Sequence, residues 1–133
     1  MSLAVVDASV LAVFYASDDR RRDAVVERLS GSYALVAAAH LDVEVVSALR
    51  GLASRHPTLR DVMPHALRHL AGFSIRRLPL APLLERMWEL RDNVTPYDAA
   101  YIAIAERLDA PLVTCDGKLA GSSGPRCAFE LIT

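Results

Sequence analysis

Four carboxylates in this chain lie among apolar residues, where a charged side chain is unfavourable unless it has a structural or functional role. They are Asp7 in VVDASV, Glu44 in DVEVV, Asp98 in PYDAAY and Asp116 in VTCDG. A carboxylate in apolar surroundings is costly unless it is paired. If the four meet, their like charges raise one another's pKa values, and a hard divalent cation is the natural counter-charge. Ligation by oxygen alone favours Mg²⁺ or Mn²⁺ over zinc.

Each carboxylate also has a purely structural interpretation. Asp98 follows Thr95 by three residues, which is the spacing of a helix-capping box. Asp7 is placed to cap a following helix, and Asp116 to start a turn with the glycine after it. Glu44 fits a surface position beside an apolar helix stripe. The spacing alone does not show that the four residues converge.

The stretch from Thr95 to Asp116 is the part of the chain that must position two of these acids. Thr95 and Pro96 predict a helix start, because a hydroxyl caps free amides and proline is already fixed at a helical φ. Residues 99–108 are apolar on nearly every face, which predicts a buried helix. Residues 112–114 then read as a short buried strand.

The rest of the chain alternates strands with helices. We expect strands at residues 3–6, 35–38, 74–77 and 127–132, and helices at 8–16, 20–29, 40–53, 58–71 and 83–90. Pro64 predicts a kink or a late start in its helix. The alternation indicates an α/β fold, with helices flanking a mostly parallel sheet of four to five strands. Asp7 and Asp116 come just after strands, at the sheet edge where such folds bind ligands.

Composition narrows the class of protein further. At 133 residues, with 53% hydrophobic and 23% charged residues, the chain fits one globular domain over 1–133. No apolar run approaches the about 18 residues of a membrane span, and the N-terminus has no basic leader, so we expect no membrane association and a cytoplasmic protein. A net charge of −1 argues against a general nucleic-acid coat. Cys115 and Cys127 are expected to be small buried apolar residues.

Several of these segments together resemble a known family. The segments are V-D-A-S after the first strand, a glutamate within a helix near position 44, and the helix Y-D-A-A-Y-I-A-I-A followed by L-V-T-C-D. They are similar to a PIN domain, and more narrowly to the VapC-type toxins of toxin–antitoxin pairs. The resemblance covers essentially the whole chain and is most specific over residues 89–116. It implies a three-layer PIN-like α/β fold.

The resemblance also implies a function and a site. It implies a Mg²⁺- or Mn²⁺-dependent endoribonuclease that hydrolyses RNA phosphodiester bonds with a metal-activated water and inhibits growth. It further implies a homodimer and a cognate antitoxin whose C-terminal segment covers the active site. The matching metal-binding carboxylates are Asp7, Glu44, Asp98 and Asp116, and the matching orienting residues are Ser9 and Thr114. Members often carry another Asp or Asn shortly after the fourth acid, whereas Gly117 and Lys118 follow here.

Two other functions remain open on sequence alone. One is a PIN-like binding module that has lost its chemistry. The other is a small phosphatase with Asp7 as nucleophile, although that chemistry wants an acid two residues later, where Ser9 stands. The run of arginines at 20–22 is expected to form a solvated face. Tyr97 and Tyr101 are near Asp98 and suited to stacking on a base, with core packing favoured for Tyr101.

Overall fold

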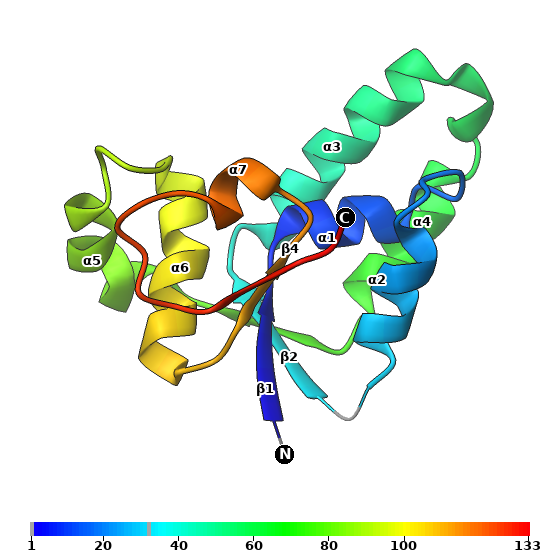
Figure 1. Ribbon diagram of the computed structural model, residues 1–133. Helices are drawn as coiled ribbons and strands as arrows, with labels where there is room; N and C mark the ends of the chain where they lie inside the picture. The colour runs from blue at the N-terminus through cyan, green and yellow to red at the C-terminus, as the bar shows by residue number, and fades with distance from the viewer. Residues whose placement is uncertain (1, 32) are drawn as a thin grey trace.

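A five-stranded parallel sheet forms the centre of the computed structural model, which describes residues 2–31 and 33–133. The strands are β1 (Ser2–Val6), β2 (Tyr33–Ala38), β3 (Ile75–Leu78), β4 (Leu112–Thr114) and β5 (Phe129–Leu131), in the spatial order β3-β2-β1-β4-β5 (Figure 1). Val5 in β1 pairs with Val36 on one side and Leu112 on the other. The predicted parallel sheet is confirmed, and its last strand is shorter than expected.

The helices follow the predicted order with shifted ends. They are α1 (Ala8–Phe14), α2 (Arg22–Leu29), α3 (Leu41–Arg55), α4 (Met63–Ala71), α5 (Leu84–Glu89), α6 (Pro96–Leu108) and α7 (Gly117–Ala120), with the short 3₁₀ turns η1 (Pro57–Leu59) and η2 (Ala81–Leu83). Pro64 is the second residue of α4, so the late start predicted for this helix is confirmed. Proline is tolerated there because the first-turn amides have no intrahelical partner.

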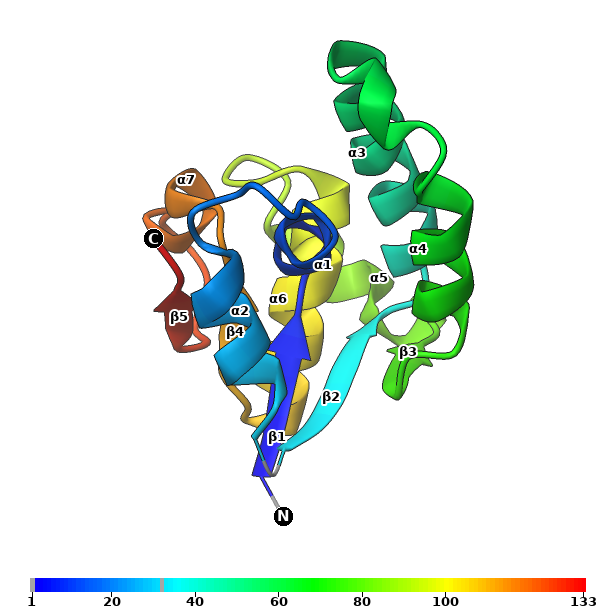
Figure 2. The ribbon, with the colours of Figure 1, turned by 90° about the vertical axis from the view of Figure 1, so that its right-hand side faces the viewer.

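The direction of winding places the helices on two faces of the sheet. From β1 through β2 to β3 the chain moves one way across the sheet, and from β3 to β4 it crosses back. Right-handed crossovers therefore put the helices α1–α4 on one face and α5–α6 on the other. α6 packs against β1, β2 and β4, and α5 packs against α6 (Figures 1 and 2). The expected three-layer arrangement is confirmed.

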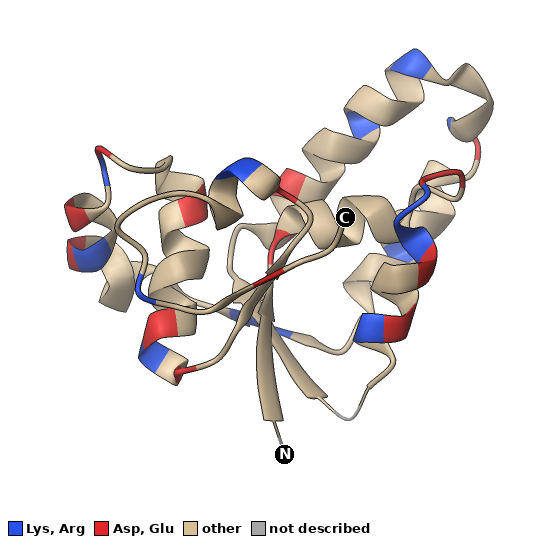
Figure 3. Cartoon of the chain, viewed as in Figure 1, with Lys and Arg blue, Asp and Glu red and all other residues tan. Residues whose placement is uncertain are grey.

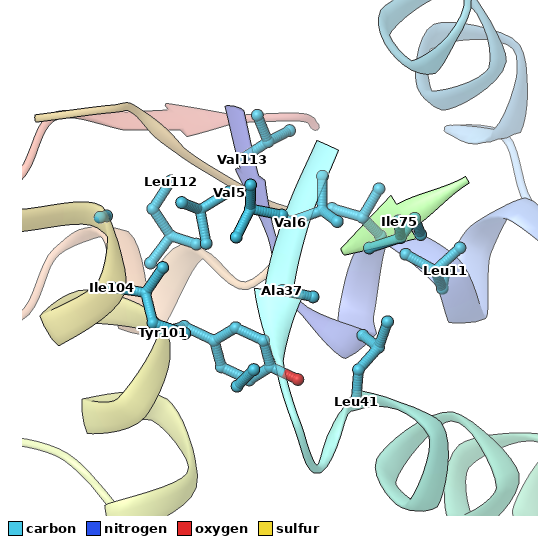
Figure 4. Packing of buried hydrophobic residues seen from close by; sticks show 14 of the residues in the cluster. Val5, Val6, Leu11, Ala37, Leu41, Ile75, Tyr101, Ile104, Leu112 and Val113 are labelled. Carbon is cyan, nitrogen blue, oxygen red and sulfur yellow. The ribbon is translucent and has the colours of Figure 1, made fainter. Parts of the chain in front are cut away.

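The buried helix α6 supplies much of the core. All seven residues from 99 to 105 are buried, because the sheet covers one side of the helix and α5 covers another. Tyr101 and Ile104 pack among Val5 and Leu112 of the sheet (Figure 4). Burying an aliphatic side chain of this size contributes about 1.5–3 kcal/mol. Asp109 ends α6 with a φ of 49°, a left-handed conformation that aspartate tolerates.

Two of the three consecutive arginines expected to form a solvated face make contacts inside the fold. Arg21 forms a two-pronged ion pair with Asp19, at 3.0 and 2.9 Å, and its third nitrogen lies 3.4 Å from the Cys115 carbonyl oxygen. Arg22 Nε donates to the Phe14 carbonyl oxygen at 2.8 Å. These guanidinium groups therefore tie the start of α2 to α1 and β4. The interpretation of a purely solvated face is wrong for both residues.

Partly buried ion pairs hold the outer elements in place. Arg86 of α5 pairs with Glu106 of α6 at 2.8 and 3.0 Å, and Glu106 also accepts the Arg126 backbone amide at 2.7 Å. Arg28 of α2 pairs with Glu130 of β5 at 2.6 and 3.1 Å. Each contact fixes a peripheral segment to a central one. None of the described helices is long and apolar enough to cross a membrane.

Candidate active site

The four carboxylates singled out in the sequence all lie where helices begin. Asp7 and Asp116 are the N-caps of α1 and α7, and Glu44 and Asp98 lie in the first turns of α3 and α6. These four helix starts share the edge of the sheet at the carboxyl ends of the strands, and acidic segments gather there in Figure 3. The free amides and positive dipole end of a helix start favour a carboxylate.

This edge is also where the winding direction reverses. The helix after β1 lies on one face of the sheet, whereas the chain enters β4 from the other face. In open α/β sheets such a switch point leaves a crevice beyond the strand ends, and ligands bind in it. Asp7 follows β1 directly, and Asp116 lies two residues beyond β4. The neighbouring strands β1 and β4 therefore present an acid on each side of the switch point.

Asp7 is the most enclosed of the four acids, with only 4% of its surface exposed. Its Oδ1 accepts from the Ser9 hydroxyl at 2.5 Å and from the backbone amides of Ser9 and Val10 at 3.1 and 3.4 Å. Its Oδ2 accepts from the Thr114 hydroxyl at 2.5 Å. Burial raises the pKa of Asp7 to about 6 even though these donors lower it, and the nearby Asp98 adds to the rise. Asp7 is thus held rigidly, and its charge is poorly compensated.

The hydroxyls of Ser9 and Thr114 connect Asp7 to the loop after β4. Ser9 Oγ accepts the Cys115 backbone amide at 2.9 Å, and Thr114 Oγ1 accepts the Asp116 amide at 3.1 Å. The two hydroxyl oxygens are 3.3 Å apart. Thr114 is fully buried, so its hydroxyl is shielded from water. The network fixes the end of β1 against the end of β4.

Asp116 and Asp98 line one wall of an open groove beside this network. Asp116 Oδ1 accepts the backbone amides of Lys118 and Leu119 at 3.0 and 3.2 Å, so the residue does cap a helical turn. Asp98 is half-buried, and its own amide donates to Thr95 Oγ1 at 3.3 Å. Burial raises the pKa of Asp98, and the charge of Asp116 raises it further, against the lowering effects of Thr95 and His40. Asp116 therefore caps its helix, whereas Asp98 lies in a helix turn that Thr95 caps.

Glu44 faces the protein interior, and its interpretation as a simple surface residue is wrong. Its Oε1 accepts the Tyr101 hydroxyl at 2.8 Å and lies 3.2 Å from Nε2 of His40. The Tyr101 side chain is 1% exposed, so its predicted core position is confirmed. Burial raises the pKa of Tyr101, followed by the charges of Glu44, Asp7 and Asp98, and the hydroxyl stays protonated and able to donate. Sequence reasoning missed His40, although it precedes Glu44 by one helical turn.

Two hollows flank Asp116, and basic side chains line both. The larger, of about 580 Å³, is lined by Asp98 and Asp116 together with Arg91 and Lys118. The smaller, of about 350 Å³, is lined by Ser9, Arg21, Arg55 and Asp116, among others. Asp116 lines both hollows. The acidic centre is thus bordered on each side by guanidinium or ammonium groups, which suits a ligand with several phosphates.

The carboxylates match a hydrated hard cation better than a fully protein-coordinated one. Within residues 2–31 and 33–133, no group of three acidic, histidine or cysteine side chains lies close enough to hold an ion by itself. Yet the charge of Asp98 contributes to the raised pKa of Asp7, and the charge of Asp116 contributes to the raised pKa of Asp98. Mg²⁺ keeps several waters and uses one or two carboxylates directly. Such an ion would satisfy this donor set through direct and water-mediated contacts.

Comparison with known proteins identifies relatives along the chain. The family model of the PIN domain matches residues 4–121. Ribonuclease VapC12 of Mycobacterium tuberculosis is 41% identical over 114 residues, covering 82% of this chain and 84% of the relative. Ribonuclease VapC1 of the same species is 38% identical over 134 residues, covering 99% of each.

Solved structures show the same architecture. PAE2754 from Pyrobaculum aerophilum superimposes with a TM-score of 0.67 at 25% identity, covering 96% of this chain and 83% of that one. VapC20 of Mycobacterium tuberculosis, a sarcin-ricin loop cleaving toxin, superimposes with a TM-score of 0.66 at 21% identity, covering 87% of this chain and 92% of that one. At these identities the likeness to VapC20 concerns the fold alone.

Proposed function

Because the chain belongs to the PIN-domain family and, within it, to the VapC ribonucleases, we propose that it is a divalent-metal-dependent endoribonuclease and the toxin of a toxin–antitoxin pair. The observation that carries this proposal is the placement of four carboxylates at four helix starts around the β1/β4 switch point. That placement suits a site for a cation and a phosphodiester, and the basic side chains beside it suit a polyanion.

In this proposal Asp7, Glu44, Asp98 and Asp116 hold Mg²⁺, or Mn²⁺ as a substitute. When bound, the cation supplies an activated water and neutralises charge that develops on the phosphate. Ser9 and Thr114 orient Asp7, because each hydroxyl donates to a different oxygen of that carboxylate. A rigid carboxylate whose charge is uncompensated binds a cation without first giving up a competing ion pair.

The basic residues of the larger hollow position the substrate in this proposal. Lys118 and Arg91 share that hollow with Asp98 and Asp116, so they are placed to bind phosphates on either side of the bond that is cut. Lys118 stands where relatives often carry another oxygen ligand. An ammonium at this position favours substrate binding over a further metal contact.

The structure speaks against the phosphatase alternative. Asp7 is almost completely buried, and both of its oxygens accept hydrogen bonds. The phosphatase chemistry also wants an acid two residues after the nucleophile, and Ser9 stands at that position. The hydroxyl of Ser9 is also committed to Asp7 and the Cys115 amide.

The decisive experiment is RNA cleavage by purified protein freed of any partner. We expect total RNA to be cut in Mg²⁺ or Mn²⁺, and cutting to be lost in EDTA and in Asp98→Asn. A folded wild-type protein that cuts no RNA in either cation would refute the nuclease proposal and favour a binding module. Cleavage that survives in Asp98→Asn would refute the assignment of the site.

The partners are part of the same proposal. We expect expression of this chain alone to arrest growth, and a cognate antitoxin, whose C-terminal segment covers the acidic edge, to relieve the arrest. We also expect a homodimer, as the resemblance to the VapC toxins implies. Light scattering on the purified protein tests the dimer. The proposed RNA substrate places the activity in the cytoplasm.

A further inference from the structure

A set of contacts just below the acidic edge joins the first turns of α3 and α6. The Tyr101 hydroxyl donates to Glu44 Oε1 at 2.8 Å, and Nε2 of His40 lies 3.2 Å from that same oxygen. Nε2 also lies 3.1 Å from the Tyr97 carbonyl oxygen. His40 and Glu44 belong to the start of α3, and Tyr97 and Tyr101 belong to α6. We call these contacts the α3–α6 clamp.

The protons of the clamp can be assigned from its acceptors. A carboxylate oxygen and a carbonyl oxygen only accept, so the His40 nitrogen that faces both of them carries the hydrogen. Glu44 Oε1 therefore receives a hydrogen bond from Tyr101, and the His40 N–H that bonds the Tyr97 carbonyl oxygen lies beside the same carboxylate oxygen, with Nε2 3.2 Å away. In the described part of the chain, Glu44 Oε2 accepts no hydrogen bond. The clamp thus fixes the rotation of the carboxylate and leaves one oxygen available.

The clamp also sets the spacing between two acids on different helices. Asp98 and Tyr101 are three residues apart, so they lie on the same face of α6. Tyr101 is close enough to Glu44, Asp7 and Asp98 for each of their charges to act on it. Sliding or rotating the first turn of α6 against α3 would break the bonds from Tyr101 and to Tyr97 together. Glu44 and Asp98 are therefore held in one relative position.

Core packing alone does not account for this arrangement. The ring of Tyr101 fills the core, and its hydroxyl is at the end turned away from α6 (Figure 4). Phenylalanine would bury the same ring without a polar atom that needs a partner. The His40 ring packs against the rings of Tyr101 and Tyr97, with centroids 5.1 and 5.9 Å away. Its Nε2 is thereby directed at the carboxylate.

We propose that Tyr101 and His40 are positioning residues of the active site. They contact one carboxylate oxygen of Glu44 and so leave its second oxygen, Oε2, available to the bound cation. The inference rests on the proposed function, because it assumes a divalent cation at the acidic edge. Residues that orient a metal ligand typically change metal affinity by about 10–100-fold when they are removed.

The test compares two tyrosines on the same helix. Tyr101→Phe removes the hydroxyl that contacts Glu44. Tyr97→Phe is the matched control, because the Tyr97 side chain is 61% exposed and only its backbone carbonyl joins the clamp. Mn²⁺ affinity is measured without RNA by titration calorimetry and by the paramagnetic resonance of free Mn²⁺. We expect Tyr101→Phe to lose about tenfold or more in affinity, and Tyr97→Phe to match the wild type.

A second pair of variants tests His40, whose side chain is partly exposed. Glutamine places an amide N–H close to where Nε2 lies, so His40→Gln is expected to keep most of the Mn²⁺ affinity. His40→Ala removes the donor and is expected to lose it. In RNA cleavage, the variants that lose affinity should require more Mn²⁺ for half-maximal rate and approach the wild-type rate at saturation.

Separate results bear on the clamp and on the nuclease proposal. Equal Mn²⁺ affinity in Tyr101→Phe and the wild type overturns the clamp, and so does an equal loss in Tyr97→Phe, which would indicate general loosening of α6. If Tyr101→Phe fails to fold, equal affinity in His40→Ala and the wild type overturns it instead. RNA cleavage by the wild type judges the nuclease proposal independently, and a wild-type protein that binds no Mn²⁺ refutes both.

Discussion

Replacing Asp7 by asparagine should make the metal-free protein more stable at neutral pH. The side chain is buried, and burial raises its pKa from an ordinary 3.8 to about 6. At about 1.4 kcal/mol per pKa unit, ionising Asp7 in the folded state costs about 3 kcal/mol. Asparagine has the same shape and keeps an oxygen for the Ser9 and Val10 amides, while its own amide can donate to Thr114. The substitution therefore removes the cost of the charge and keeps the helix cap.

The sign of this effect depends on pH in a defined window. Below about pH 4 the carboxyl of Asp7 is protonated in both folded and unfolded chains, so the two proteins should differ little. Between about pH 4 and pH 6 the unfolded chain loses this proton before the folded one does, so wild-type stability falls as pH rises. Above that range the advantage of Asp7→Asn should reach its full value of about 3 kcal/mol.

Urea denaturation in EDTA at pH 4, 5, 6 and 7 measures this difference directly. Asp61→Asn, at an exposed position between η1 and α4, controls for the loss of one negative charge. Adding Mn²⁺ at pH 7 should raise the stability of the wild type more than that of Asp7→Asn, because the variant lacks one of the four proposed metal-binding carboxylates. Parallel stability profiles for the wild type and Asp7→Asn from pH 4 to pH 7 would show that burial of the charge is not costly, and would refute the reasoning.

Three further changes test other parts of the structure. Lys118→Ala should weaken RNA binding without changing the melting temperature. The slope of log binding constant against log salt concentration should become shallower by about 0.7, as expected for one lost phosphate contact to a single strand. An unchanged slope in filter binding would rule out the contact. Arg86→Met should lower the free energy of unfolding by about 1–3 kcal/mol, since Glu106 keeps only part of its hydrogen bonding; urea titration decides. Gly124→Ala should cost about 1–3 kcal/mol, because Gly124 has a φ of 102° and the new Cβ would meet Asn93 at 3.1 Å; equal stability would contradict this.

The order of strands and helices along the chain could be predicted from the sequence because local signals encode it. The apolar run of α6 and its Thr95–Pro96 start predicted a buried helix with the right ends. Pro64 predicted the late start of α4. The spatial order of the strands has no comparable local signal, since it depends on which face of the sheet each connecting helix packs against. Only the parallel pairing followed from the alternation of elements.

The residues of the candidate site could be predicted from the sequence, but their arrangement in space could not. Apolar neighbours marked the acids, and the same neighbours explain why Asp7 is buried. Nothing in the sequence indicated that Glu44 would turn inward to Tyr101, because the contact spans 57 positions and depends on how α3 meets α6. Arg21 was misread for a related reason. Its partner Asp19 is two residues away in sequence, but the Cys115 carbonyl lies 94 positions away.

The bond from Thr114 to Asp7 spans 107 positions, and this has a consequence during synthesis on the ribosome. The strand β1 emerges long before β4, the strand that must lie beside it. Until then Asp7 lacks one of its donors, and the crevice has only one side. Messages truncated before Thr114 should therefore yield harmless fragments. The site can therefore assemble only after the segment that carries Thr114 has left the ribosome.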